Sequence, residues 1–479
     1  MTKLFLFLIL SFFSTQSFAG SCPDGSEPVK SISSDGYYYV YNCGNTDSNN
    51  TKEPKASING RWKGIVNCKW DGNYSLNNGA LGGMFDFTIR DGWDNPDEKI
   101  LKTKSFLSYQ KSQYEIKSYH IDRHSFSAVV KYDWGEESQW SGVVNNNIMT
   151  LRYPNNGCIG RLSKVEEISF ESYSPKMPID FIDGVKDDPR FTITGLLILP
   201  EQKKDKYPVM VMVMHSGCSF GARDFTYGHD IRKLGVATLE LDLCEPRGLS
   251  ENFPILQGNF YKLTPWMGAA DALYALKFLQ GHPKIDSNKI GIVGWSWGGN
   301  VALYTNLDII RKPILPESDY SLSVAYYPLC RYLEKQQVSN TKLHIFIGDK
   351  DEATRASFCK DMVKSINDFG GNASLDVYPD SYHSFDDIWR DSKPKYTSRM
   401  FNVTEDCKYW VDSDGRRSWR LNDMQIDLDD YDSWDLSADV YGKEYSAECD
   451  HWGLVQGRTD STAQQSAVKL MQLIRKFLL

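Results

Sequence analysis

The sequence has no excess of basic charge. Its 479 residues carry 54 Lys and Arg against 62 Asp and Glu, a formal net charge of −8. Nucleic-acid binding needs a basic surface that neutralises phosphates, and no long basic run is present. Nucleic acid is therefore not an expected partner. The hydrophobic share of 41% and the charged share of 24% are those of a globular protein, so a disordered or collagen-like chain is excluded.

Long apolar runs are equally scarce, and the one that exists begins the chain. Lys3 precedes the apolar block at residues 4–13, and the small residues Ser17 and Ala19 follow it. This layout predicts a cleavable secretory signal peptide at residues 1–19. No later run approaches the roughly 20 apolar residues of a membrane-spanning helix. We therefore expect a secreted or periplasmic protein without a transmembrane span.

The ten cysteines include no Cys-x-x-Cys pair, which argues against a zinc site or a redox motif, so neither a metal nor a cofactor is expected. All ten follow residue 19, and an even number in an exported chain indicates disulfides. Lipid attachment at Cys22 is an alternative, and it would leave nine cysteines, one of them without a partner for a disulfide. Sequence does not determine the pairing, although the order along the chain suggests three pairs: Cys22 with Cys43, Cys68 with Cys158, and Cys407 with Cys449.

The pattern of residues predicts two domains. Residues 20–165 alternate short apolar and polar runs between turn signals, which is typical of a small antiparallel β domain. From residue 166 to 479, apolar strands alternate with helical segments, the pattern of a mostly parallel α/β sheet. A polar, Asp-rich insertion at residues 386–458 interrupts this domain and should form a lid or a side wall. The predicted strands are 192–199, 209–214, 236–241, 290–293, 323–327, 344–347 and 374–378, and the predicted helices are 268–279, 356–369 and 462–478.

A Gly-x-Ser-x-Gly sequence at residues 294–298 is the strongest chemical signal. It follows the apolar run 290–293 and precedes a segment that can continue as a helix. Glycines beside Ser296 allow the sharp strand-to-helix turn that exposes a nucleophilic hydroxyl and places the next amide at a helix start. This context predicts that Ser296 is a nucleophile.

A serine hydroxyl needs a base to take its proton and an acid to orient that base. His383 follows Ser296 and comes soon after the last predicted strand, 374–378, whereas His451 lies far past that strand, inside the insertion, and is the weaker candidate. Asp351 follows the strand 344–347 and is the expected acid, with Asp349 as the alternative. The order Ser, Asp, His is that of the α/β-hydrolases.

Acyl transfer also develops an oxyanion, which two backbone amides can stabilise. The amide of Trp297, directly after the nucleophile, is the first candidate. The second should follow the strand 209–214, where Gly217 is preferred and Cys218 is the neighbouring alternative.

From about residue 190 to the end, the chain resembles the dienelactone hydrolase family. Beyond the serine motif, the matching segments are 242–248 (DLCEPRG), 282–294 (HPKIDSNKIGIVG), 326–330 (YYPLC), Gly348-x-x-Asp351 and 382–386 (YHSFD). The resemblance implies an α/β-hydrolase fold, ester hydrolysis without a cofactor, and a disulfide between Cys330 and Cys359. Two roles are compatible with Arg247 in this segment. It could bind a substrate carboxylate, or it could hold its turn in place through an acid such as Asp242.

Two departures from the family set the limits of this resemblance. The namesake enzymes use a cysteine nucleophile, whereas Ser296 favours a general ester, either a small molecule or one linked to a carbohydrate. The β domain and the insertion lie outside the usual family outline. Five tryptophans of the β domain could contact a polysaccharide, although aromatic residues of such domains are more often core; they are Trp62, Trp70, Trp93, Trp134 and Trp140.

Two other functions remain open at this stage. A prolyl-oligopeptidase-like peptidase has a similar serine motif, but it needs a propeller domain that about 145 residues cannot build. A hydrolase fold that has lost activity and serves in binding is the alternative from another class.

Overall fold

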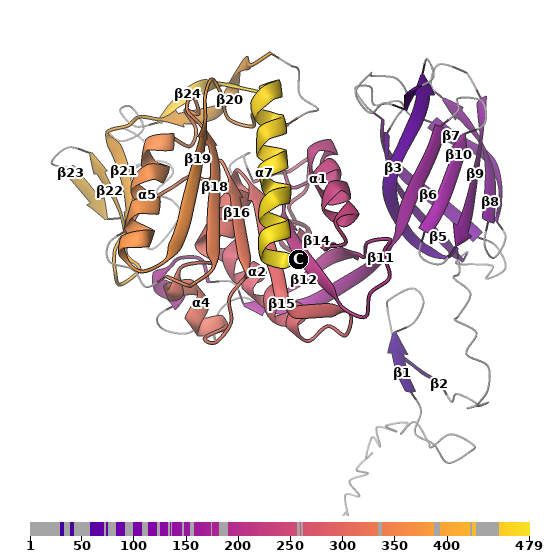
Figure 1. Ribbon diagram of the computed structural model, residues 1–479, viewed down its shortest axis with the longest axis horizontal. Helices are drawn as coiled ribbons and strands as arrows, with labels where there is room; N and C mark the ends of the chain where they lie inside the picture. Colours follow the sequence, from indigo (N-terminus) through magenta and orange to yellow (C-terminus); the bar gives the residue numbers. More distant parts are fainter. Residues whose placement is uncertain are drawn as a thin grey trace, which may run out of the picture.

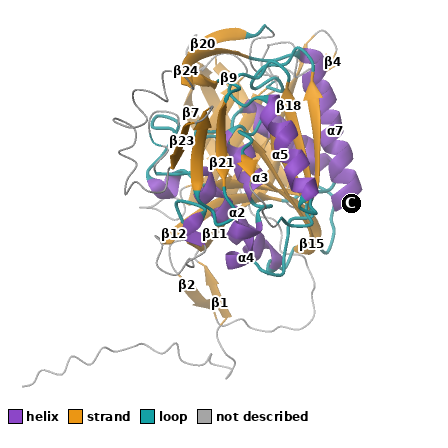
Figure 2. Cartoon of the chain, turned by 90° about the vertical axis from the view of Figure 1, so that its left-hand side faces the viewer, coloured by secondary structure: helices purple, strands orange, loops and turns teal. Residues whose placement is uncertain are grey.

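The structure is a computed structural model, and Figures 1 and 2 show it from two sides. The residues that it describes are 29–32, 39–42, 58–70, 73–74, 83–91, 99–107, 114–121, 125–132, 135, 137–145, 148–153, 158–173, 175–181, 190–255, 259, 262–333, 338–387, 393–421, 424–427 and 450–479. The predicted signal peptide, Cys22 and Cys43 lie outside these residues.

The C-terminal part is built on a sheet with the strand order β19-β18-β16-β15-β13-β14-β12. Neighbouring strands are parallel except for β12, which runs antiparallel to β14. Every residue of β13 is buried, as expected for a strand that helices cover on both faces. The strands are β12 (Arg190–Ile198), β13 (Tyr207–Val213), β14 (Ala237–Asp242), β15 (Ile285–Trp295), β16 (Leu322–Tyr326), β18 (Lys342–Gly348) and β19 (Asn372–Tyr378).

Helices cover both faces of this sheet (Figure 1). One layer contains α1 and α7, which contact each other, and the other contains α2 and α3, which do the same. Local residues determine where α2 begins. Thr264 accepts a hydrogen bond from the Met267 amide, and Pro265 occupies the first helical position. The helices are α1 (Ala222–Lys233), α2 (Pro265–Gln280), α3 (Trp297–Tyr304), α4 (Asp308–Ile314), α5 (Ala356–Asp368) and α7 (Asp460–Leu478), with short 3₁₀ turns η2 (Ile179–Phe181) and η3 (Glu245–Arg247).

The N-terminal part is an antiparallel β structure, drawn in indigo and purple in Figure 1. Its inner side chains are apolar, and Trp62 and Trp140 are both fully buried. These two tryptophans therefore belong to the core and cannot form an exposed sugar-binding platform. The strands are β3 (Gly60–Trp70), β4 (Asn73–Tyr74), β5 (Gly83–Asp91), β6 (Lys99–Leu107), β7 (Tyr114–Ile121), β8 (Ser125–Tyr132), β9 (Glu137–Asn145) and β10 (Ile148–Tyr153), preceded by the hairpin of β1 (Val29–Ile32) and β2 (Tyr39–Asn42).

The long strand β11 (Cys158–Tyr173) connects the two parts. Its first half pairs with β3 and β10, and its second half pairs with β12. The predicted domain boundary at residues 165/166 thus falls inside a continuous strand. A buried ion pair between Lys63 of β3 and Glu240 of β14 also links the two parts. The α/β-hydrolase fold with a preceding antiparallel β domain, predicted from the sequence, is confirmed.

The insertion at residues 386–458 contributes further strands. Two of them, β20 and β24, pair antiparallel, and the others extend the short strand β17 (Tyr332–Leu333) into a small sheet. The end of the insertion returns to the sheet, because the Gly457 amide donates a hydrogen bond to the His383 carbonyl at 3.0 Å. The strands are β20 (Lys395–Val403), β21 (Cys407–Val411), β22 (Arg417–Leu421), β23 (Met424–Asp427) and β24 (Asp450–Gln456).

Within the described ranges, no helix has the length and apolar character that crossing a membrane requires.

Candidate active site

Ser296 lies at a strained turn between β15 and α3. Its backbone has φ 55° and ψ −115°, a conformation that residues other than glycine rarely adopt. The turn is tight, because a Cβ atom at Gly294 would lie 1.9 Å from the Gly298 carbonyl oxygen, and one at Gly298 would lie 2.4 Å from that of Met214. Only glycines permit this approach of the chain to itself. The Ser296 hydroxyl is consequently lifted to the carboxyl edge of the sheet.

His383 lies between Ser296 and Asp351. Its Nε2 is 3.0 Å from Ser296 Oγ, and its Nδ1 is 2.8 Å from Asp351 Oδ2. The His383 and Asp351 side chains are only 2% and 0% exposed, so water cannot compete for their contact. The structure thus brings together, in one line of hydrogen bonds, three residues that are far apart in the sequence.

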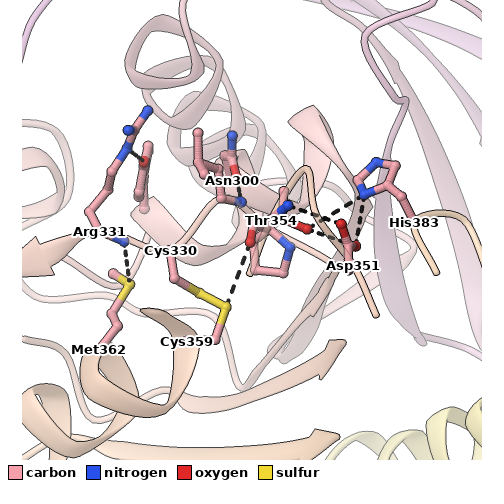
Figure 3. Close-up of a disulfide and its surroundings, with 11 residues drawn as sticks. Asn300, Cys330, Arg331, Asp351, Thr354, Cys359, Met362 and His383 are labelled. Atoms are coloured by element: carbon pink, nitrogen blue, oxygen red, sulfur yellow. Dashed lines mark hydrogen bonds and ion pairs between the residues drawn. A yellow bond between two sulfur atoms is a disulfide. The ribbon is translucent and has the colours of Figure 1, made fainter. Parts of the chain in front are cut away.

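The Asp351 carboxylate is held by its own loop, as Figure 3 shows. The amides of Ala353 and Thr354 donate to Oδ1 at 3.0 and 2.9 Å, and the Thr354 hydroxyl donates to Oδ2 at 2.8 Å. These donors fix the orientation of the carboxylate. The role of Thr354 was not predicted from the sequence, although a hydroxyl three residues after an acid in a tight turn is a recognisable signal.

The alternative acid, Asp349, has a different environment. Its Oδ1 accepts a hydrogen bond from the Ser381 amide at 3.2 Å, and its backbone amide donates to Tyr378. These contacts join the ends of β18 and β19. The structure therefore places Asp351, rather than Asp349, against the imidazole of His383.

The backbone amides of the two predicted oxyanion donors, Trp297 and Gly217, have different surroundings. Trp297 is the first residue of α3, where backbone N–H groups have no partner within the helix. The Gly217 amide donates to His215 Nδ1 at 2.9 Å, and the Cys218 amide donates to the His215 carbonyl at 3.2 Å. An oxyanion could therefore meet the Gly217 amide only after that amide leaves the His215 ring.

Two disulfides flank the site. Cys330 and Cys359 are bonded with an S–S distance of 2.04 Å, so the pair that the family resemblance implied is present. It ties the segment after β16 to α5, close to the Asp351 loop (Figure 3). Cys218 and Cys244 form a second disulfide, at 2.09 Å, that was not predicted. They follow the neighbouring parallel strands β13 and β14, whose ends meet at one edge of the sheet, and this was the available signal.

The other predicted pairs are only partly described. The register of β3 and β11 sets Cys68 opposite Cys158, and Cys407 is disulfide-bonded. Both pairings, and that of Cys22 with Cys43, stay predictions.

Arg247 is buried. Its side chain is 2% exposed and forms an ion pair with Asp271 at 2.9 Å. Asp271 also accepts a hydrogen bond from the Ser172 hydroxyl at 2.5 Å. Asp242, the acid suggested from the sequence, instead accepts the amides of Cys244 and Glu245. This placement favours the structural role of Arg247, with Asp271 as its partner.

A buried polar group behind His383 was also missed. The Tyr327 hydroxyl donates to Asp386 Oδ1 at 2.7 Å and accepts a hydrogen bond from Arg223 at 2.8 Å. Burial raises the pKa of the Tyr327 phenol and that of the Asp386 carboxyl. Among the described residues, no group of three or more His, Cys, Asp or Glu side chains is arranged to hold a metal ion.

Comparison with protein families places part of the chain in a known family outline. Residues 247–411 match the model of the dienelactone hydrolase family. This segment contains Ser296, Asp351 and His383, and the resemblance predicted from the motifs is confirmed over it. The family match supports a hydrolase that acts on small molecules. None of the curated proteins matches the sequence.

Three solved structures illustrate the structural likeness. A protein described as a dienelactone hydrolase, from Klebsiella pneumoniae, is 16% identical, with a TM-score of 0.34, and the match covers 46% of this chain and 89% of that one. A thermophilic esterase from Thermogutta terrifontis is 15% identical, with a TM-score of 0.32 and coverages of 40% and 79%. A dienelactone hydrolase-like promiscuous phosphotriesterase from metagenomic libraries is 13% identical, with a TM-score of 0.34 and coverages of 46% and 85%.

Proposed function

We propose that this chain, with its dienelactone hydrolase family segment at residues 247–411, is a serine hydrolase that cleaves carboxylic esters. The observation that carries the proposal is the 3.0 Å contact between Ser296 Oγ and His383 Nε2 at a strained strand-to-helix turn. Strain of this kind persists only where the surrounding structure enforces it, and it is concentrated at functional sites.

The proposed reaction proceeds in two steps. Ser296 Oγ attacks the ester carbonyl carbon while His383 Nε2 takes its proton, and the alcohol then leaves with that proton. Water attacks the resulting acyl-serine with the same assistance from His383, which releases the acid and restores the serine. Asp351 holds the imidazole in the tautomer that leaves Nε2 free to accept, and it stabilises the imidazolium that forms.

The oxyanion that develops in both steps would be stabilised by two amides. The N–H of Trp297 lies at the start of α3, where the helix dipole also favours negative charge. The Gly217 amide would supply the second donor by exchanging its bond to His215 Nδ1 for one to the oxyanion. The Cys218–Cys244 disulfide anchors this loop beside the serine turn.

The proposed substrate is a small-molecule or carbohydrate-linked ester, without a cofactor. Ser296 in place of the namesake family's cysteine favours a general ester over a dienelactone. We also propose export to the periplasm or the exterior, which the signal-like residues 1–19 and the disulfides support. A polysaccharide contact by the N-terminal domain would have to use residues other than the buried Trp62 and Trp140.

Labelling with a fluorophosphonate tests the proposed nucleophile. The mature, disulfide-intact protein should incorporate one probe molecule, and mass spectrometry should find it on the peptide that contains Ser296. A protein that is folded but does not react would instead support a hydrolase fold used only for binding.

Ester preference is tested on the same preparation. We expect hydrolysis of p-nitrophenyl acetate and butyrate, with preference for the shorter chain. Labelling at Ser296 together with cleavage of peptides but not of esters would favour the peptidase alternative.

A further inference from the structure

Tyr327 has an unusual position next to the imidazole of His383. It directly follows β16 and adopts φ 36°, in the left-handed region that a tyrosine rarely enters. Its amide donates to the Phe346 carbonyl at 2.6 Å, which fixes the backbone between β16 and β18. Its ring centre lies 4.7 Å from that of His383, with the two planes at 60°. The phenol ring therefore forms one wall of the space that the imidazole occupies.

The hydroxyl of Tyr327 ties this wall to the His383 loop. It donates to Oδ1 of Asp386, which follows His383 by three residues. The other oxygen of Asp386 accepts the indole N–H of Trp295 at 3.0 Å, and Trp295 directly precedes the nucleophile. One buried carboxylate thus joins the serine turn, the end of β16 and the His383 loop.

Arg223 makes a second contact with the Tyr327 hydroxyl. It donates to the Tyr327 hydroxyl at 2.8 Å and forms an ion pair with Asp224 at 2.8 Å. All these side chains are buried, and a buried polar group that loses its partner is costly. Two hydrogen bonds, from Arg223 and to Asp386, consequently hold the hydroxyl of Tyr327 in one place.

We propose that Tyr327 is a positioning residue for His383, with Asp386 as its anchor. The proposal rests on the proposed function, because it concerns the base of that reaction. His383 must meet Ser296 with one nitrogen and Asp351 with the other at the same time, which only one orientation of the ring allows. The Tyr327 ring keeps the imidazole in that orientation, and the bond to Asp386 keeps the ring and the His383 loop at a fixed separation.

Tyr327→Phe tests the proposal, because it keeps the ring and removes only the hydroxyl. We expect kcat for p-nitrophenyl acetate to fall about 10- to 100-fold, the loss typical of a misplaced catalytic group. KM should stay nearly constant, because no substrate contact is removed. The rate of fluorophosphonate labelling at Ser296 should fall in parallel with kcat.

Tyr320→Phe is the matched control. Tyr320 is another buried tyrosine, and its hydroxyl donates to the Ala272 carbonyl, in contact with α2 rather than with the His383 loop. Its loss should lower stability without changing kcat. Equal losses of kcat in both variants, or unchanged kcat in Tyr327→Phe, would overturn the positioning role.

Asp386→Asn provides a second variant of unchanged shape, which serves also if Tyr327→Phe does not fold. It should lower kcat to a similar extent. The double variant should lose no more than the worse single variant, because residues that act as one unit are not additive. Independent, multiplying losses would contradict a shared role. Wild-type protein that neither labels at Ser296 nor cleaves esters would remove the proposed function itself, and that result is distinct from a defect confined to the variants.

Discussion

Among the residues that the structure describes, two groups of Ser, His and Asp have nearly the same spacing. In the elbow group, His383 contacts Ser296 at 3.0 Å and Asp351 at 2.8 Å. In what we call the strand group, His344 contacts Ser374 at 2.7 Å and Asp376 at 2.9 Å. Distances alone therefore do not distinguish a candidate catalytic site from a structural one.

The backbone around each serine does distinguish them. Ser296 has φ 55° and is followed by the first turn of α3, whereas Ser374 lies within β19, the edge strand of the sheet. The Ser374 hydroxyl also lies 3.3 Å from the Leu343 carbonyl, which competes for its proton. A strand has no helix start to stabilise an oxyanion. The turn at the serine, rather than the residue types, therefore distinguishes the elbow group from the strand group.

Removing each serine hydroxyl should give the largest difference between the groups. We expect Ser296→Ala to lower kcat/KM for p-nitrophenyl acetate by about 10⁵-fold or more, because no nucleophile remains. Ser374→Ala should leave kcat/KM within about twofold of wild type, as a partly buried structural hydroxyl contributes chiefly to stability. Parallel steady-state kinetics of the two variants measure this. Activity that survives in the first variant and disappears in the second would reverse the assignment.

Substitution of the acids should affect activity in the same order as substitution of the serines, with the larger loss in the elbow group. Asp351→Asn should lower kcat by about 10³- to 10⁴-fold, because the amide cannot stabilise the imidazolium and favours the wrong tautomer. Asp376→Asn and Asp349→Asn should each retain most of the activity, since neither carboxylate contacts His383. Kinetics of all three variants at one pH provide the check. A larger loss in Asp349→Asn than in Asp351→Asn would make Asp349 the acid.

Much of this architecture could be predicted from the sequence. The strand at residues 209–214 is a buried apolar run, whereas residues 374–378 alternate polar and apolar side chains. Both patterns are local properties of the sequence that predict a strand. The pairing of Ser296, Asp351 and His383 could be predicted as a set because each follows a strand of a parallel sheet, whose carboxyl ends meet.

Other features could not be predicted because they depend on packing between distant segments. Asp386 contacts Tyr327, which is 59 residues away in the sequence. Arg247 pairs with Asp271 rather than with Asp242, which is closer to it in the sequence. No local pattern encodes such contacts. The continuity of β11 was also hidden, because the composition changes near residue 166 while the hydrogen-bonded ladder does not.

The glycine beneath Ser296 gives a sharper test of the turn. A Cβ atom at Gly294 would lie 1.9 Å from a backbone oxygen, so Gly294→Ala must displace the turn. We expect kcat/KM to fall about 100-fold, as for an ångström-scale shift of a nucleophile. Gly281→Ala is the control, because its Cβ would meet nothing closer than 3.6 Å. Kinetics and thermal unfolding of both variants separate loss of geometry from loss of fold, and equal, full activity in both would show that the strained turn is dispensable.

The smallest expected effect concerns the strand group and its protonation. Burial lowers the pKa of His344 below its ordinary 6.5, despite the opposing influence of Asp376. The unfolded chain then binds a proton more readily than the folded one, so this contribution to stability is present at neutral pH and is lost as the pH falls below 6.5. His344→Gln should lower the free energy of unfolding at neutral pH by about 1 to 2 kcal/mol, because Ser374 and Asp376 lose their partner.

The free energy of unfolding of His344→Gln should also fall less steeply than that of wild type as the pH is lowered. The activity per folded molecule should stay that of wild type. Urea unfolding between about pH 7.5 and pH 5 measures both changes. Ser374→Ala keeps the imidazole and should keep the acid slope, so it is the matched control. An acid slope in His344→Gln as steep as that of wild type would mean that other groups dominate the pH dependence. A loss of kcat in that variant would mean that the strand group takes part in catalysis, which would remove the distinction between the two groups.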